Sequence, residues 1–345
     1  MVDQPAVQCD SLAKSYGAIS AITGISFAAE EGTLMALVGP SGCGKTTTLR
    51  VIAGFEAPDT GTVVIRGNLV NGPSTFLSPD RRKVGMVFQD YALFPHLSVR
   101  QNIGFGLPRG AKNQFRVDEV LDLVGLSGAG GRQPHELSGG EQQRVALARA
   151  LAPSPAVVLM DEPFSNLDAS LRAKVRTDVR HILKAAGTAA IFVTHDQDEA
   201  LSLADEVGIM LDGCVVQVGA PSNVYAHPES LAVASFLGDA NILPGEATNG
   251  RVTTELGILN TTKPSSGHVS VLVRPEEVNL GHVVDDQERY QVIEKDFYGH
   301  DQMLQLRMPS GRVLRVRCGP GHLANPGDWV SASVSTPVTT FADHR

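Results

Sequence analysis

The spacing at which hydrophobic residues recur changes once along this chain. Up to about Leu237, short runs of apolar and β-branched residues alternate with stretches of helical period. Such alternation is typical of a mostly parallel α/β sheet, whose buried strands form uninterrupted apolar runs. We expect such strands at 34–39 (LMALVG), 156–160 (AVVLM) and 190–193 (AIFV). The first part of the chain is therefore predicted to be an α/β domain.

One helix of this domain has a clear amphipathic pattern. Between Leu167 and Leu183, apolar residues recur at helical spacing and basic residues fall between them. The apolar positions are Leu171, Val175, Val179, Ile182 and Leu183, and the basic ones are Arg172, Lys174, Arg176, Arg180 and Lys184. The basic residues are most simply a solvated helix face and not a nucleic-acid site.

After residues 238–245 (GDANILPG) apolar and polar residues alternate instead. The segments 303–308 (MLQLRM) and 313–318 (VLRVRC), with PSG between them, predict a β-hairpin. Further short strands are expected at 271–278 (VLVRPEEV) and 329–334 (WVSASV). This tail is predicted to be a small all-β, barrel-like domain.

Composition narrows the class of protein. A length of 345 residues suits two or three domains, and 42% hydrophobic with 19% charged residues is ordinary for a protein with ample core. A formal charge of −8 argues against general affinity for nucleic acid. Four scattered cysteines without CxxC spacing, and a start without signal-peptide character, suggest the cytosol. No apolar run approaches the ~20 residues of a membrane span, so other chains are expected to supply any membrane part.

The segment 39–46, GPSGCGKT, fits the phosphate-loop pattern and lies between a predicted strand and a predicted helix. Its backbone N–H groups are expected to hold phosphates. Lys45 is expected to reach the β- and γ-phosphates, and the Thr46 hydroxyl to bind Mg²⁺.

Two adjacent carboxylates end the apolar strand in VVLMDEP (157–163). Asp161 at the strand end is suited to holding Mg²⁺ through water, as the acidic partner of a phosphate loop does. Glu162 points to the other side of the chain and is free to activate a water. An incidental acidic pair in a loop is the simpler alternative.

Two further polar residues follow predicted strands. His195 comes after AIFVT, where it could contact the γ-phosphate, although a histidine by itself is more often structural. Gln89 follows VGMVF and could orient Mg²⁺ or the attacking water.

The segment 137–141, LSGGE, opens an apolar helix. Ser138 and Glu141 fit a capping box, which explains these two residues but not Gly139 and Gly140 between them, since glycine in a first turn costs helix stability. Glycines are useful where another group approaches the backbone closely. A second phosphate-bearing face is the sharper interpretation.

With these motifs in order, residues 6–237 resemble the ATP-binding cassette (ABC) proteins. LSGGE is similar to the signature motif of that family, Gln89 to its glutamine loop, SNLD (165–168) to its aspartate loop and His195 to its switch histidine. In this family the signature of one copy covers the γ-phosphate held by the phosphate loop of another. The resemblance thus implies a head-to-tail homodimer that binds ATP and Mg²⁺.

The resemblance assigns roles to particular residues. Glu162, His195 and Gln89 are the expected catalytic residues, and Thr46, Gln89 and Asp161 the expected metal site. The expected nucleotide contacts are Tyr16 (stacked on adenine), Gly39, Pro40, Ser41, Gly42, Cys43, Gly44, Lys45, Thr46, Thr47, Ser138, Gly139, Gly140, Glu141 and Asp168. For Tyr16 an ordinary surface tyrosine is the alternative.

The tail extends the resemblance to importer ATPases with a C-terminal β-barrel regulatory domain, which serve maltose, polyamines, sulfate, molybdate or ferric iron. The segments 53–61, 90–99 and 102–108 most resemble the ferric-iron type. The expected domains are an ABC ATPase domain over 1–239, with a helical subdomain over about 90–155, and an OB-like regulatory barrel over 240–345.

The resemblance also implies partners. The ATPase is expected at the cytoplasmic face of a membrane, beneath transmembrane permease subunits and indirectly served by an extracytoplasmic solute-binding protein. The segment after Gln89, with Tyr91, Phe94 and Phe105, is expected to contact the permease, although each aromatic residue could equally belong to the core.

Several alternatives stay open at this point. The cargo could be a polyamine, a sugar, sulfate or another oxyanion. A soluble ABC ATPase of DNA repair or translation usually has two cassettes or a basic face, which this chain lacks. A nucleotide-sensing regulatory protein would not need Glu162, Gln89 and His195. An exporter is possible, but the tail resembles importers.

Overall fold

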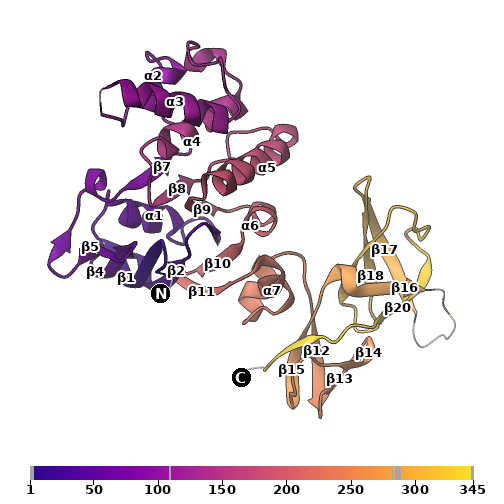
Figure 1. The fold of residues 1–345 in the computed structure, drawn as a ribbon. Coiled ribbons are helices and arrows are strands. Elements are labelled where there is room, and N and C mark those ends of the chain that lie inside the picture. Colours follow the sequence, from indigo (N-terminus) through magenta and orange to yellow (C-terminus); the bar gives the residue numbers. More distant parts are fainter. Residues whose placement is uncertain (1–3, 109, 282, 284–288, 343–345) are drawn as a thin grey trace. The chain divides into compact units, whose positions relative to one another are not determined.

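The computed structural model describes residues 4–108, 110–281, 283 and 289–342, and it divides into two compact units, Met1–Ala226 and His227–Arg345 (Figure 1). Each unit has its own hydrophobic cluster of buried residues. The first is mixed α/β and the second is built mainly of strands, which confirms the predicted fold class.

Five strands of the first unit form an antiparallel sheet in the order β2-β1-β4-β5-β6. They are β1 (Val7–Tyr16), β2 (Ile19–Ala29), β4 (Thr60–Ile65), β5 (Asn68–Gly72) and β6 (Thr75–Phe76). The pairing of β1 with β2 is interrupted by register shifts between Cys9 and Leu12, Leu12 and Ala13, and Lys14 and Ser15. This sheet shares a core with the second sheet of the unit.

The second sheet has six strands in the order β11-β10-β3-β9-β8-β7. They are β3 (Leu34–Val38), β7 (Val84–Val87), β8 (Val157–Asp161), β9 (Ala189–Thr194), β10 (Glu206–Leu211) and β11 (Cys214–Gly219). All pairs are parallel except the β10–β11 hairpin. Every residue of β3 and β9 is buried, as their uninterrupted apolar runs predict.

Helices surround this sheet and extend from it. They are α1 (Lys45–Ala53), α2 (Val99–Gly104), α3 (Ala111–Leu123), α4 (Gly139–Leu151), α5 (Ala169–Ala186), α6 (Gln197–Leu203) and α7 (Pro221–Ala226), with 3₁₀ turns at Pro79–Arg81 and Pro134–Glu136. Helix α1 packs against β8 and β9, and α4 packs against β7. In Figure 1, α4 lies between the sheet and the helices α2 and α3.

The second unit begins with α8 (Leu231–Phe236) and continues with two five-stranded antiparallel sheets around one core. One sheet contains β14 (Gly257–Asn260), β13 (Arg251–Thr254), β12 (Asn241–Thr248), β15 (Gly267–Val273) and β21 (Thr339–Ala342). The other contains β16 (Val278–Gly281), β20 (Trp329–Val334), β17 (Tyr290–Phe297), β18 (Gln302–Arg307) and β19 (Val313–Cys318). The predicted hairpin is the antiparallel pair β18–β19.

The segment 271–278 is not one continuous strand as expected. Strand β15 ends at Val273, and a 3₁₀ turn follows at Pro275–Glu277. Pro275 has no N–H group for a strand ladder, and the Glu277 carboxylate accepts a hydrogen bond from the Arg274 backbone N–H at 2.9 Å. These local preferences outweigh the apolar pattern and end the strand.

Helix α1 is fixed at its C-terminal end by a buried guanidinium. Arg82 is only 2% exposed, and it donates hydrogen bonds to the carbonyl oxygens of Val51 (2.7 Å), Ile52 (3.0 Å) and Leu77 (2.7 Å). Carbonyls at a helix C-terminus lack partners within the helix and favour a positive charge. Arg82 therefore stabilises the end of α1 opposite the phosphate loop.

We predict that Arg82→Met lowers the free energy of unfolding of the first unit by about 3 kcal/mol, because it leaves buried carbonyls without donors. Urea unfolding followed by circular dichroism measures this change. Fluorescence of the single tryptophan, Trp329 in the second unit, should keep its midpoint. The exposed neighbour is the control: Arg81→Met should change stability by no more than about 0.5 kcal/mol. Equal effects of the two variants would contradict the assigned role of Arg82.

Candidate functional site

The phosphate loop connects β3 to α1 with a backbone that requires glycine. Gly44 has φ 97°, and a Cβ atom there would lie 2.2 Å from the Ala21 carbonyl oxygen of β2. A Cβ on Gly39 would lie 2.1 Å from the Met210 carbonyl oxygen. Helix α1 begins directly after this loop and has no acidic residue in its first turn. Its free N–H groups are thus available to an anion.

Lys45 is buried, with 6% of its surface exposed. Its Nζ donates hydrogen bonds to the carbonyl oxygens of Gly39 (2.7 Å) and Pro40 (2.8 Å). These partners are neutral, so they hold the ammonium group within the loop without cancelling its charge. A phosphate oxygen can compensate that charge better than a carbonyl can.

Thr46 and Asp161 meet beside the loop. The Thr46 hydroxyl donates a hydrogen bond of 2.9 Å to Asp161 Oδ1. Burial raises the pKa of the Asp161 carboxyl above its usual value, and the Thr46 hydrogen bond opposes that shift. Mg²⁺ in nucleotide sites takes one or two protein oxygens and completes its shell with water and phosphate oxygens. A hydroxyl and a carboxylate in this arrangement fit such an ion.

Glu162 and His195 form a second pair at the same edge of the sheet. His195 Nδ1 lies 3.3 Å from Glu162 Oε2, and the Glu162 side chain is half-buried. The Glu162 backbone has φ 42°, and its N–H donates to the Val193 carbonyl at 3.1 Å. A left-handed conformation at a residue other than glycine is uncommon and costs backbone energy, and it occurs in turns and at functional sites. The side chains of the adjacent residues Asp161 and Glu162 have different partners, Thr46 and His195 respectively.

Gln89 lies two residues beyond the end of β7, which pairs in parallel with β8. Its carbonyl oxygen accepts a hydrogen bond of 2.8 Å from Asn166 Nδ2, so its backbone is tied to the SNLD segment. Its own side chain is exposed. The structure thus brings five predicted residues to one sheet edge: Thr46, Gln89, Asp161, Glu162 and His195.

The LSGGE segment has the predicted capping box. Ser138 N–H and its hydroxyl both donate to Glu141 Oε2 at 2.8 Å, and Arg132 Nη1 lies 3.2 Å from Glu141 Oε1. The side-chain hydrogen bonds of Ser138 and Glu141 stay within this part of the described chain, so the motif completes no phosphate site by itself.

The two glycines have a packing reason that the sequence did not reveal. A Cβ on Gly140 would lie 2.9 Å from Val175 Cγ2 of α5, and one on Gly139 would lie 3.2 Å from Leu167 Cδ2. Close packing of the start of α4 against Val175 of α5 and against Leu167 of the SNLD segment therefore already favours a small residue at both positions. Gly139 and Gly140 therefore have a reason within one chain that does not require a second ligand, and the neighbouring side chains that supply it cannot be recognised from the LSGGE segment alone.

Asp168 and Tyr16 occupy different surroundings. Asp168 caps α5, since its Oδ1 accepts from the Leu171 N–H at 2.9 Å. Tyr16 ends β1 and is 46% exposed, with Lys14 Nζ 5.6 Å from its ring centroid. Asp59 is a residue that the motifs did not indicate: its Oδ2 accepts a hydrogen bond from the Ser15 N–H at 2.7 Å and so holds the strand end that carries Tyr16. The only hint of this contact in the sequence is an aspartate directly before the strand that begins at Thr60.

One residue of the predicted contact surface is placed differently. Tyr91 is only 5% exposed, because the chain turns there with φ 62° and Arg149 Nη2 holds its carbonyl at 2.8 Å. It therefore belongs to the interior. Phe105 is 61% exposed, and its ring centroid lies 4.3 Å from that of Phe94.

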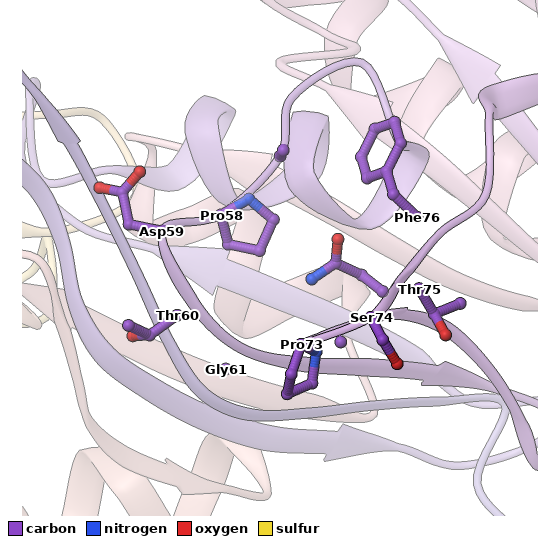
Figure 2. A pocket seen from close by; sticks show the side chains of 11 residues that line it. Pro58, Asp59, Thr60, Gly61, Pro73, Ser74, Thr75 and Phe76 are labelled. Atoms are coloured by element: carbon purple, nitrogen blue, oxygen red, sulfur yellow. The ribbon is translucent and has the colours of Figure 1, made fainter.

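A cavity of about 520 Å³ lies elsewhere, between residues 57–61 and 71–76 (Figure 2). Pro58, Pro73, Ser74, Thr75 and Phe76 are among its lining residues. None of the predicted phosphate or metal residues lines it, so it is separate from the site described above.

A parallel sheet with a glycine loop, a lysine, a hydroxyl–carboxylate pair and a second carboxylate at its edge defines a P-loop nucleoside triphosphatase. Residues 22–165 match the family described as ABC transporter. The fold is also similar to cbiO1 from Clostridium perfringens, part of the ABC transporter complex cbiONQ (TM-score 0.60, 28% identity, 65% of this chain and 92% of that one). A second similar structure is the dimeric ATP-binding cassette MJ0796 in a post-hydrolysis state with ADP and Pi (TM-score 0.53, 30% identity, 62% and 98%).

Curated relatives resemble this chain over most of its length. Fe(3+) ions import ATP-binding protein FbpC 2 of Rhodococcus jostii is 43% identical over 340 residues, 95% of this chain and 96% of that protein. The FbpC protein of Serratia marcescens is 41% identical over 342 residues, with 97% and 99% covered. That of Mesorhizobium japonicum is 48% identical over 277 residues, with 79% and 77% covered. The chain belongs to the ABC transporter family, as one of its ATP-hydrolysing proteins, and the family predicted from the motifs is confirmed.

Among the described residues, no helix combines the length and the apolar character that a membrane crossing requires.

Proposed function

We propose that this ATPase drives the import of ferric iron through partner membrane subunits. The observation that carries the catalytic part is the convergence of Thr46–Asp161 and Glu162–His195 at one sheet edge beside Lys45. The cargo is supported by the iron-import names of relatives that span the second unit as well as the first.

In the proposed reaction, Lys45 binds the β- and γ-phosphates. Thr46 and Asp161 would hold Mg²⁺, and the ion would supply charge that offsets the charge of the phosphates. Glu162 accepts a proton from the attacking water. His195, next to Glu162, contacts the γ-phosphate, and Gln89 orients the water or the metal. Positioning and charge compensation supply most of the catalysis in phosphoryl transfer.

The proposed assembly is a head-to-tail homodimer. Ser138, Gly139, Gly140 and Glu141 of each copy would cover the γ-phosphate bound by the other, and Asp168 would lie at the contact. This is supported by the completeness of the phosphate loop and the incompleteness of the LSGGE site within one chain. Tyr16 is proposed to stack on adenine, since it is exposed on a hairpin whose second strand approaches Gly44.

Contact with permease subunits is proposed at Phe94 and Phe105. The buried Asn102 side chain holds the preceding turn, because its Nδ2 donates to the carbonyls of Phe94 (3.1 Å) and Leu97 (2.9 Å). The exposed Phe105 ring at the end of α2 packs against the partly buried Phe94 ring of this turn, and an exposed aromatic ring on a rigid support is suited to an interface. The protein would then work peripherally at the cytoplasmic face of a membrane. A regulatory role is proposed for the β-domain. The proposed domain boundary near residues 239 and 240 lies within the second compact unit, just before β12 begins at Asn241.

We predict that Glu162→Gln binds ATP with Mg²⁺ normally but hydrolyses it about 10² to 10⁴ times more slowly, a loss of roughly 3 to 5 kcal/mol in barrier stabilisation. Glutamine keeps the size of glutamate but cannot accept the proton. Lys45→Ala should weaken binding as well as turnover, since it removes the charge beside the phosphates. ATP affinity and single-turnover rates of both variants are to be measured. Hydrolysis by Glu162→Gln within about tenfold of the parent would rule out Glu162 as the general base.

We predict that ATP with Mg²⁺ converts Glu162→Gln from a mainly monomeric or weakly associated protein into a dimer. Each copy offers an LSGGE segment to the phosphates of the other, and slow hydrolysis should preserve the assembly. Light scattering with and without nucleotide measures the mass. The double variant Glu162→Gln/Lys45→Ala is the control that should not respond, and an unchanged mass for Glu162→Gln itself would count against the shared site.

We predict that deletion of the gene lowers cellular uptake of radiolabelled ferric iron and leaves uptake of polyamines, sulfate and sugars unchanged. Re-expression of the parent should restore iron uptake, and Glu162→Gln should not. Normal iron uptake together with loss of another solute would reject iron as the cargo and leave the ATPase assignment intact.

A further inference from the structure

The imidazole of His195 is held weakly by its own surroundings. Its side chain is 57% exposed, and Nδ1 lies 3.3 Å from Glu162 Oε2. An exposed ring is not fixed by packing, so its direction depends on the backbone that carries it. What holds that backbone therefore limits where the imidazole can lie relative to the Glu162 carboxylate.

Hydrogen bonds hold the chain on both sides of His195. The Thr194 hydroxyl donates to Glu199 Oε2 at 2.6 Å and accepts from the Asp196 N–H at 3.0 Å. The Asp196 carboxylate in turn accepts from the Glu199 N–H at 3.1 Å and caps α6. Glu199 is only 4% exposed, so a carboxylate lies at the buried centre of this turn.

Arg172 of α5 faces this turn from the other side. Its Nη1 lies 3.7 Å from Asp196 Oδ2, and its Nε lies 4.0 Å from Glu199 Oε1. A buried carboxylate is costly without a compensating positive charge. Arg176 and Arg172, both on α5, supply that charge to Glu199, and Arg172 also reaches Asp196.

The same guanidinium also reaches the SNLD segment. Arg172 Nη2 donates a hydrogen bond of 3.1 Å to the Leu167 carbonyl. Two residues earlier, the Ser165 N–H (3.2 Å) and hydroxyl (2.9 Å) both donate to the Glu162 carbonyl. One side chain thus connects the loop that supports Glu162 with the turn that carries His195.

We propose that Arg172 is a positioning residue for ATP hydrolysis: by binding the Leu167 carbonyl while facing Asp196 and Glu199, it holds His195 at its place beside Glu162. The inference rests on the proposed roles of these two residues and adds what aligns them. Arg172 acts through His195 and is not itself assigned a contact with the nucleotide.

The test uses the full chain with Arg172→Gln, which keeps most of the side-chain stem but removes the charge and the fork. Expected is a fall in kcat of about tenfold, with KM and ATP affinity within about twofold, because the phosphate loop is untouched. Arg172→Lys, which keeps a charge near both carboxylates, should recover part of kcat. Urea unfolding checks that each variant is folded.

Arg180→Gln is the matched control. Arg180 lies on the same helix with similar exposure (34% against 30%), and it also binds a carbonyl, that of Leu203, and a carboxylate, Asp205 at 2.9 Å. Its partners lie outside the 194–199 turn, so kcat should not change.

A double-mutant comparison separates positioning from general structure. In a His195→Ala background, Arg172→Gln should lower kcat less than twofold further. An additional tenfold loss there, a rise in KM with unchanged kcat, or an unchanged kcat in Arg172→Gln alone would overturn the proposal. If His195→Ala keeps full kcat, the proposed role of His195 is wrong and this inference fails with it. If His195→Ala lowers kcat but Arg172→Gln does not, only the positioning role of Arg172 is rejected.

Discussion

In the six-stranded sheet, Val38 at the end of β3 pairs with Thr194 of β9, and Val193 of β9 pairs with Asp161 of β8. The carboxyl ends of the three parallel strands therefore lie at one edge. Within two residues of these paired positions lie the start of the phosphate loop, His195, and the carboxylates Asp161 and Glu162. A shift of one residue in either pairing would turn the side chains of a strand to its other face. The register of these strands is thus what the rest of the site depends on.

Close polar contacts hold the functional side chains at this edge of the sheet. Lys45 binds two loop carbonyls, Asp161 accepts from Thr46, and Glu162 lies against His195. The Lys45 ammonium and the Thr46–Asp161 pair are thus preorganised, which lowers the cost of ordering the site when a nucleotide binds. Arg82 contributes at a distance, since it holds the far end of α1, the helix that begins directly after the phosphate loop.

The LSGGE segment shows why a sequence motif can have two physical causes. Its capping box and the tight contact of Gly140 with Val175 are complete within one chain. These contacts also leave a rigid helix start with little side-chain bulk. A surface of that kind is suited to approach by a phosphate, so the proposed shared nucleotide site would favour the same residues as the packing within one chain.

The sequence by itself determined the α/β and all-β parts, the phosphate loop and the family. It also predicted strands at 34–39, 156–160 and 190–193, which the structure has at Leu34–Val38, Val157–Asp161 and Ala189–Thr194. These follow from local patterns, because strand periodicity, loop glycines and strand-end carboxylates are all encoded within a few neighbouring residues. It predicted Thr46, Asp161, Glu162 and His195 as candidates but not that they pair as Thr46–Asp161 and Glu162–His195. Only the tertiary structure decided that Tyr91 is buried and that Gly140 packs on α5. It also decided that Arg82 binds the end of α1, that Asp59 binds the end of β1 and that Arg172 binds the Leu167 carbonyl. Each of these depends on a contact between segments far apart in the chain, and such contacts are set by how helices and strands pack together, which no short stretch of sequence specifies.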